Sequence, residues 1–341
     1  MARGQVTGIT DTGAAAAEVP VMRAICPEFF LAAVSSAVIA SGCATATEVP
    51  ATGQSPGTPG SGASLAGRRP FPADNAWNID VSAAPVDPRS ATLIASCGLR
   101  NLHPDFGTTY LGVANGIPYV LVSGRQGRVP VNFDYADESD PGPYPIPSDA
   151  PIEGGADATG DRHVVVIDVD AWKLYELFDA HPIHGGSSWH AGSGAVFDLA
   201  SNALRPAGWT SADAAGLPIF PGLVRYDEAA EQHAIDHALR FTCPRTRKGY
   251  VPPARHYASS DTSSALPPMG MRVRLKGTFD TTSFSPTLRA ILRSMMHHGM
   301  LLADNGSAWY VSGAPDPRWS DAELAALARV PSSAFEVVLG K

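Results

Sequence analysis

The chain has 341 residues, of which 44% are hydrophobic and only 17% are charged. This composition is typical of a folded protein and excludes an intrinsically disordered chain. The formal net charge of −8 excludes a strongly basic surface, so we expect no nucleic-acid partner. No uncharged apolar run reaches the length of about 18 residues that a membrane-spanning helix needs, so we expect no such helix in the mature chain.

Residues 1–46 have the pattern of an export signal. Arg23 supplies positive charge, and the apolar stretch 29–40 that follows is too short to cross a bilayer. The sequence Ala-Ser-Gly-Cys ending at Cys43 resembles a bacterial lipobox, whereas 44–46 offers a competing Ala-Thr-Ala cleavage site. We therefore predict an extracytoplasmic protein, either a lipoprotein anchored to the membrane through Cys43 or a secreted protein.

The signal is followed by a Pro/Gly/Ser-rich segment, residues 47–69, which we predict to be a flexible linker. Residues 70–341 show neither an internal repeat nor a second linker, so we predict one globular domain and a monomer. Its two cysteines are Cys97 and Cys243. In an exported protein they can form a disulfide, but the sequence leaves open that both are buried free thiols.

In the first part of the domain, Asp87 and the following proline begin a short helix that ends at Gly98. Runs of β-forming residues predict strands at 117–122, 129–134, 162–169, 172–179 and 195–199. Long irregular segments separate them at 137–161 and 202–221. The neighbouring strands 162–169 and 172–179 are expected to pair as a hairpin.

In the second part, alternation predicts a strand over 235–242, with an Ala-rich helix over 229–240 as the alternative. A further strand follows at 271–279. The helical period then predicts a helix from Pro286 to His298, capped by Ser285.

Two elements are predicted after this helix. The turn Asp304-Asn305-Gly306 predicts a hairpin between 300–303 and 307–312, and Ser320 begins a last helix that reaches Arg329. Glycine (33 residues) and proline (30 residues) are frequent, which also favours many short strands. The fold class is therefore mainly β with added helices (α+β), a β-sandwich or jelly-roll-like single domain.

The chain contains no nucleophile elbow, zinc-protease motif, phosphate loop or Cys-x-x-Cys pair, so candidate sites rest on residues that interrupt a pattern. In the 162–179 hairpin, Val165 should face Glu176, which lies between Leu174 and Phe178 on an otherwise apolar face. Burial there would raise the pKa of Glu176, as a general acid needs, and His163 is near enough to share a proton. The alternative is a solvated face or an edge strand.

Three further catalytic candidates follow from the pattern. His237 lies on an apolar face, where a buried structural histidine is the more common explanation. Arg255, His256 and Tyr257 lie together in one loop, and their groups suit binding of carboxylates or sugar hydroxyls. Asp304 is a reserve candidate.

Asp213 and Trp209 lie in the long segment 202–221, and long ordered loops often carry function. Trp209 can stack against a sugar ring, and Trp189 and Trp309 would extend such a platform. The alternative is that Trp209 packs the loop onto the core and Asp213 caps a helix.

A group of loop residues has the spacing of a possible zinc site, namely Asp179, His181, His184 and His190. Its glycine-rich loop fixes no ligand geometry, so we expect solvated histidines and neither a metal nor a cofactor.

Three passages, at 235–241, 254–260 and 303–310, read IDHALRF, ARHYASS and ADNGSAWY. They resemble a group of uncharacterised exported bacterial proteins. The resemblance covers about residues 72–338 and implies an intact exported domain, with no activity that can be transferred.

We expect an exported carbohydrate-active enzyme, most simply a glycoside hydrolase acting on an extracellular polysaccharide or oligosaccharide. Hydrolysis needs two carboxyl groups, for which Glu176 and Asp213 are the first choice. A polysaccharide lyase would instead use His237, His256 or Tyr257 as the base, with Arg255 neutralising a uronate. A non-catalytic, surface-tethered glycan-binding lipoprotein would need only the aromatic platform, and an envelope structural protein would need neither.

Overall fold

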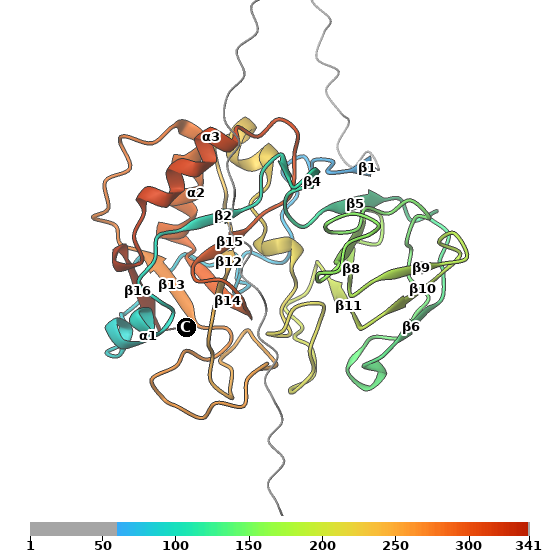
Figure 1. Cartoon of the computed structure of the whole chain (residues 1–341), viewed down its shortest axis with the longest axis horizontal. Helices are drawn as coiled ribbons and strands as arrows, with labels where there is room; N and C mark the ends of the chain where they lie inside the picture. The colour runs from blue at the N-terminus through green and yellow to red at the C-terminus, as the bar shows by residue number, and fades with distance from the viewer. Residues whose placement is uncertain (1–59, 340–341) are drawn as a thin grey trace, which may run out of the picture. The chain divides into compact units, whose positions relative to one another are not determined.

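Figure 1 shows a computed structural model of the chain, which describes residues 60–339. These residues belong to one compact unit, Gly53–Lys341. The predicted signal 1–46, with Cys43, lies outside the described residues. Within 60–339, no helix has the length and apolar character needed to cross a membrane.

A five-stranded sheet contains the predicted hairpin. Its strands run in the order β1 (Gly60–Ser61), β5 (Tyr119–Val122), β7 (Val164–Asp168), β8 (Lys173–Phe178) and β11 (Ser193–Asp198). β7 and β8 are antiparallel, and Val165 faces Glu176, which confirms the predicted register. The register places Glu176 on the face that also carries Val165.

A six-stranded sheet contains the second half of the domain. Its strands run in the order β16 (Phe335–Val338), β13 (Arg272–Leu275), β14 (Met300–Asn305), β12 (Leu239–Cys243), β15 (Tyr310–Ser312) and β2 (His103–Asp105). The predicted hairpin around Asp304 is wrong, because β12 lies between β14 and β15 and pairs with both. Asp304 therefore lies within a central strand.

The remaining elements are short. A three-stranded sheet joins β6 (Val131–Phe133), β10 (Ser188–Ala191) and β9 (His181–Ile183), and β3 (Thr109–Tyr110) pairs with β4 (Val113–Ala114). The α-helices are α1 (Ser90–Ser96), α2 (Pro286–His297) and α3 (Asp321–Leu324). Short 3-10 turns occur at η1 (Ala136–Glu138), η2 (Phe220–Gly222), η4 (Ala325–Arg329) and η5 (Ser332–Ala334), and η3 (Asp227–Gln232) is a π-helix.

The fold is thus mainly β with few helices, an α+β fold. Figure 1 shows β12–β16 beside α1–α3, and β5, β8 and β11 in a second group of strands. Successive side chains of β7 point to opposite faces of the sheet, so Val165 and Ile167 lie in the cluster of buried side chains shared with the six-stranded sheet. Val164 and Val166 point into a second cluster, shared with β6 and β10. The five-stranded sheet therefore buries both faces.

The helix boundaries follow their capping residues. The Ser285 hydroxyl accepts a hydrogen bond from the Leu288 amide at the start of α2, and the Ser320 hydroxyl accepts one from Glu323 at the start of α3. Both predicted starts are confirmed. Between 229 and 242 both expectations hold in part, because the helical turns of η3 end at Gln232 and the strand begins at Leu239.

The folded region begins before residue 70. Ala63 and Leu65 are buried, and the Tyr119 hydroxyl donates to the Ala63 carbonyl over 3.0 Å. β1 also pairs with β5. The predicted linker 47–69 is therefore wrong for its last ten residues, in which two apolar side chains were enough to dock a Gly/Ser-rich segment.

The two cysteines of the domain form a disulfide. Cys97 and Cys243 have Cα atoms 5.0 Å apart and are separated by 146 residues. The bond ties the C-terminal end of α1 to the end of β12. Of the two alternatives left open by the sequence, the structure therefore shows the disulfide and not two free thiols.

Candidate functional site

A cluster of charged side chains lies where β12 and β14 meet the loops before β7 and after β11. Arg240, in β12, is almost completely buried. Its Nη1 donates to the Ser312 hydroxyl of β15 over 2.7 Å, and its Nη2 lies 3.3 Å from Oδ2 of Asp213. The side chain of Asp213 is 0% exposed.

The backbone of the 211–216 loop positions Asp213. Ser211 accepts a hydrogen bond from the Asp213 amide and donates to the Leu217 carbonyl over 2.6 Å. The Ala215 amide donates to the Ala303 carbonyl of β14 over 3.0 Å. The loop is thereby attached to the strand that carries Asp304, so the two carboxyl groups come close together.

The Asp213 carboxyl is buried without full compensation. Burial raises its pKa to about 7, Arg240 opposes the rise, and the nearby Asp304 carboxylate adds to it. Neither Asp213 carboxylate oxygen accepts a hydrogen bond from any residue in 60–339, because the approach of Arg240 has ion-pair rather than hydrogen-bond geometry. At neutral pH this group is therefore partly protonated.

Two half-buried carboxyl groups lie at the outer side of the cluster, Asp304 and Glu153. Burial raises the pKa of Asp304, and the Asn305 amide donates to this carboxyl over 2.6 Å. Burial acts in the same direction on Glu153, but the imidazolium of His163 outweighs it and lowers the pKa of Glu153. The charges of His163 and Arg240 act on both groups.

His163 is doubly protonated in this environment. Its Nδ1 lies 2.6 Å from Glu153 Oε2, and its Nε2 lies 3.0 Å from the Ala212 carbonyl, which can only accept. Burial alone would lower the pKa of His163, but the Glu153 carboxylate raises it to about 9. Two exposed carboxylates, Asp105 and Asp161, interact with the same cluster.

Glu176 is a buried supporting residue. Its side chain accepts hydrogen bonds from the Ile219 and Phe220 amides, at 2.9 to 3.0 Å, and thereby caps η2. Burial raises its pKa to about 7, against the effect of these amides. The predicted rise is present, but a fully buried carboxyl that holds two backbone amides cannot reach a substrate.

His237 belongs to a different cluster. Its Nε2 lies 3.0 Å from Glu228 Oε2, and its Nδ1 lies 2.8 Å from the Ala238 carbonyl. Glu228 also pairs with the buried Arg225. His237 and Glu176 therefore lie in separate clusters, and the structural explanation weighed for His237 fits its surroundings.

The loop after residue 253 forms a half-exposed aromatic surface. The His256 and Tyr257 rings stack with centroids 5.6 Å apart, and Tyr250 stacks on Tyr257 at 6.5 Å. The His256 Nδ1 lies 2.9 Å from the Ala214 carbonyl, one residue from Asp213. Arg255 donates from Nε to the Arg205 carbonyl over 2.8 Å. This loop therefore lies beside Asp213.

The tryptophan platform is only partly present. Trp209 is half-buried beside Arg205, whose guanidinium lies 5.6 Å from the indole. Trp189 and Trp309 are 1% and 0% exposed. The expectation that these two bind a ligand is wrong, because each fills a hydrophobic cluster instead.

His181 and His190 lie opposite each other on β9 and β10, but each pairs with a different carboxylate. His181 pairs with Asp179 over 2.8 Å, whereas His190 pairs with Asp134 over 3.2 Å. Among residues 60–339, no group of three or more histidine, cysteine or acidic side chains has the geometry to hold a metal ion.

Sequence reasoning missed Glu153, His163 as its partner, and Arg240. Arg240 had a detectable signal, because it is the charged residue of the strand and lies between the apolar Leu239 and Phe241. Glu153 had none, since it lies in an acidic loop. Comparisons of the chain with protein-family models, with curated proteins and with solved structures give no match.

Proposed function

We propose that the protein is a glycoside hydrolase acting on an extracellular polysaccharide or oligosaccharide, with Asp304 as the general acid and Glu153 as the second carboxylate. The observation that carries the proposal is that these two half-buried groups lie beside the same cations yet have pKa values displaced in opposite directions. Such a separation distinguishes acid from base or nucleophile in enzymes with paired carboxyl groups.

The chemistry follows from the protonation states. The raised pKa of Asp304 makes it the better proton donor of the two, so it is assigned to protonate the leaving glycosidic oxygen. Glu153 stays ionised beside His163 and either activates water or attacks the anomeric carbon; the separation between the two groups when substrate is bound decides which. This pair replaces Glu176 and Asp213, neither of which is exposed.

The buried residues support this pair without touching substrate. His163 lowers the pKa of Glu153 and so keeps it ionised, and Asp213 and Asp304 both interact with the charge of Arg240. The stacked rings of His256, Tyr257 and Tyr250 offer flat faces on which sugar rings can pack. Thr246, in the preceding loop, donates to Asn305 over 2.7 Å and ties this surface to the strand of Asp304.

The test is hydrolysis of a polysaccharide panel, followed as new reducing ends. Asp304→Asn and Glu153→Gln should each lower kcat by about 10²- to 10⁴-fold, because general acid–base catalysis typically raises the rate by a factor of that size. Asp149→Asn, which changes an exposed carboxyl with no side-chain hydrogen bond or ion pair among the described residues, is the matched control. If the wild type is active and both variants keep its full kcat, the assignment of Asp304 and Glu153 as the catalytic carboxyl groups is wrong.

A lyase is the second candidate, and the tautomer of His256 favours it. The carbonyl of Ala214 can only accept, so Nδ1 of His256 donates to it and Nε2 is the ring nitrogen left to face a substrate; Glu138 Oε2 lies 3.9 Å from Nε2. Arg255 is adjacent. In that case His256→Ala would abolish activity, Asp304→Asn would not, and products would carry an ultraviolet-absorbing unsaturated end.

A tethered glycan-binding lipoprotein is the third candidate. It would bind glycans without cleaving them, and Tyr257→Ala would lower affinity while Asp304→Asn would not. Export and lipidation at Cys43 belong to the same proposal. A Cys43→Ala chain should move from the membrane fraction to the soluble exported fraction, and unchanged fractionation would mean that the other cleavage site is used.

A further inference from the structure

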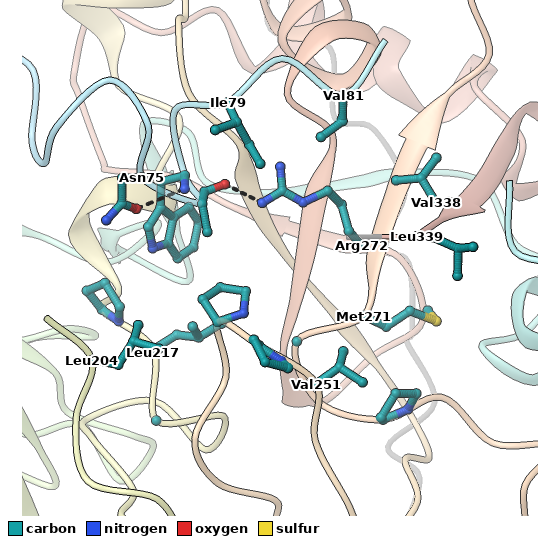
Figure 2. A pocket seen from close by; sticks show the side chains of 18 of the residues that line it. Asn75, Ile79, Val81, Leu204, Leu217, Val251, Met271, Arg272, Val338 and Leu339 are labelled. Atoms are coloured by element: carbon teal, nitrogen blue, oxygen red, sulfur yellow. Dashed lines mark hydrogen bonds between the residues drawn. The ribbon is translucent and has the colours of Figure 1, made fainter. Parts of the chain in front are cut away.

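A cavity of about 530 Å³ lies outside the proposed active site. Figure 2 shows Ile79, Val81, Leu217, Val251 and Met271 around it, with Val338 at one side. Neither Asp304 nor Glu153 lines this space. Its volume falls in the range of about 300 to 1,000 Å³ that is usual for small-molecule sites.

The wall of the cavity is apolar and reaches the protein surface. Trp77, Leu217 and Met271 are buried in its wall, whereas Leu204 and Leu339 at its edge are 50% and 43% exposed. Large apolar side chains exposed at the edge of an apolar cavity are typical of a ligand entrance.

Two positively charged side chains line the cavity without a carboxylate partner. Arg272 uses its Nη atoms to hold the carbonyl groups of Ala76 and His298. Within residues 60–339, neither Arg272 nor Arg247 forms an ion pair, and the buried Nε of Arg247 has no hydrogen-bond partner.

Of the other charged residues that line the cavity, Arg89 and Arg205 are already paired, whereas Asp74 is an exposed carboxylate that accepts a hydrogen bond from Asn202 and forms no ion pair within residues 60–339. Arg89 pairs with Asp87, and Arg205 pairs with Asp140. Burial lowers the pKa of Arg272 to about 10, so its guanidinium remains charged at neutral pH. The cavity therefore carries excess positive charge in a chain whose net charge is −8.

We propose that this cavity binds a single-chain amphiphile with an anionic head group, such as a long-chain carboxylate or an alkyl phosphate. The aliphatic chain would replace water along the apolar wall. The head group would accept hydrogen bonds from the free N–H groups of Arg247 and Arg272, because guanidinium groups recognise carboxylates and phosphates. This site and the proposed hydrolase site are independent.

The test is calorimetric titration of the full chain with ligands of one chain length, below their micelle concentrations. The ligands are dodecanoate, dodecyl phosphate, dodecanol and dodecyltrimethylammonium. Both anions should bind at least about tenfold more tightly than the alcohol, which corresponds to one charge-assisted hydrogen bond, and the cation should bind most weakly. The ratio between the two anions identifies the preferred head group.

Variants separate the charge from the apolar wall. Arg247→Met should lower the affinity for the preferred anion about tenfold and leave that for dodecanol unchanged. Leu204→Glu, which adds negative charge at the exposed edge, should also weaken anion binding. Arg125→Met and Leu111→Trp change exposed residues that do not line the cavity and should have no effect.

Three results would overturn the proposal. One is equal affinity of wild-type protein for dodecanoate, dodecyl phosphate and dodecanol. Another is an Arg247→Met variant that loses anion and alcohol binding equally or keeps both. The third is the absence of binding to any of the four ligands by protein whose circular dichroism shows it to be folded.

Discussion

Asp213 and Arg240 form an ion pair with side-chain exposures of only 0% and 5%. Taking two charges out of water costs free energy that their mutual attraction does not fully return unless both are also hydrogen-bonded. Arg240 has the Ser312 hydroxyl, whereas the Asp213 carboxylate accepts no hydrogen bond among the described residues. The pair therefore makes the stability of the protein depend on pH.

The pH dependence has a definite sign. The pKa of Asp213 rises from 3.8 to about 7, so the folded state holds a proton that the unfolded state has already released. The contribution of Asp213 to the free energy of unfolding should thus fall as the pH rises between about 4 and 7. Asp213→Asn cannot titrate, so its free energy of unfolding should fall less steeply over this range.

Urea denaturation at several pH values measures these slopes. Glu176 also has a raised pKa and contributes a slope of the same sign, so the variant should keep part of the effect. Asp149→Asn should behave as the wild type. Equal slopes for wild type and Asp213→Asn would show that the Asp213 carboxyl titrates alike in the folded and unfolded states.

At the scale of elements, the disulfide joins α1 to β12 across 146 residues of chain. A cross-link that closes a long loop restricts the unfolded chain, and removal of a native disulfide typically costs about 2 to 5 kcal/mol. The double variant Cys97→Ser, Cys243→Ser should lose stability in that range, because β12 is also the central strand to which β14 and β15 attach.

Denaturation with and without a reducing agent checks this prediction. Reductant should destabilise the wild type and leave the double variant unchanged. Mass spectrometry of the unreduced protein should show Cys97 and Cys243 peptides linked. Two freely alkylated thiols in the native exported protein would contradict the bond.

At the scale of the whole molecule, the domain boundary lies at or before Gly60. Leu65, within the segment predicted to be a linker, is 6% exposed and belongs to the main hydrophobic cluster. Leu65→Ala should lower the free energy of unfolding by about 2 to 5 kcal/mol, the usual cost of emptying a buried leucine site.

Leu111→Ala provides the control, because Leu111 is 87% exposed. Thermal or urea unfolding of the full chain measures both variants. A Leu65→Ala protein as stable as the control would place this segment outside the cooperative fold and return the boundary to residue 70.

Local features of the chain could be predicted because they depend on neighbours in sequence. The Ser285 cap needs only the amide three residues later, and a short turn brings Val165 opposite Glu176. Alternation and composition indicated the α+β class for the same reason. These interactions join residues that are near each other in sequence, so the local amino-acid order is enough to predict them.

The partners of distant segments were decided by tertiary structure alone. The local sequence around Asp304 predicted a hairpin turn. In the structure β12 pairs with β14 instead, because long-range strand pairing and burial outweigh the local turn preference. That insertion brings Arg240 to Asp213 and Asp304, while Trp309 becomes part of the core. The cavity beside Arg272 likewise depends on contacts between segments remote in sequence, which no local pattern encodes. The pairing of Glu153 with His163 spans only ten residues, but it depends on the path of an irregular loop for which the sequence shows no periodic pattern.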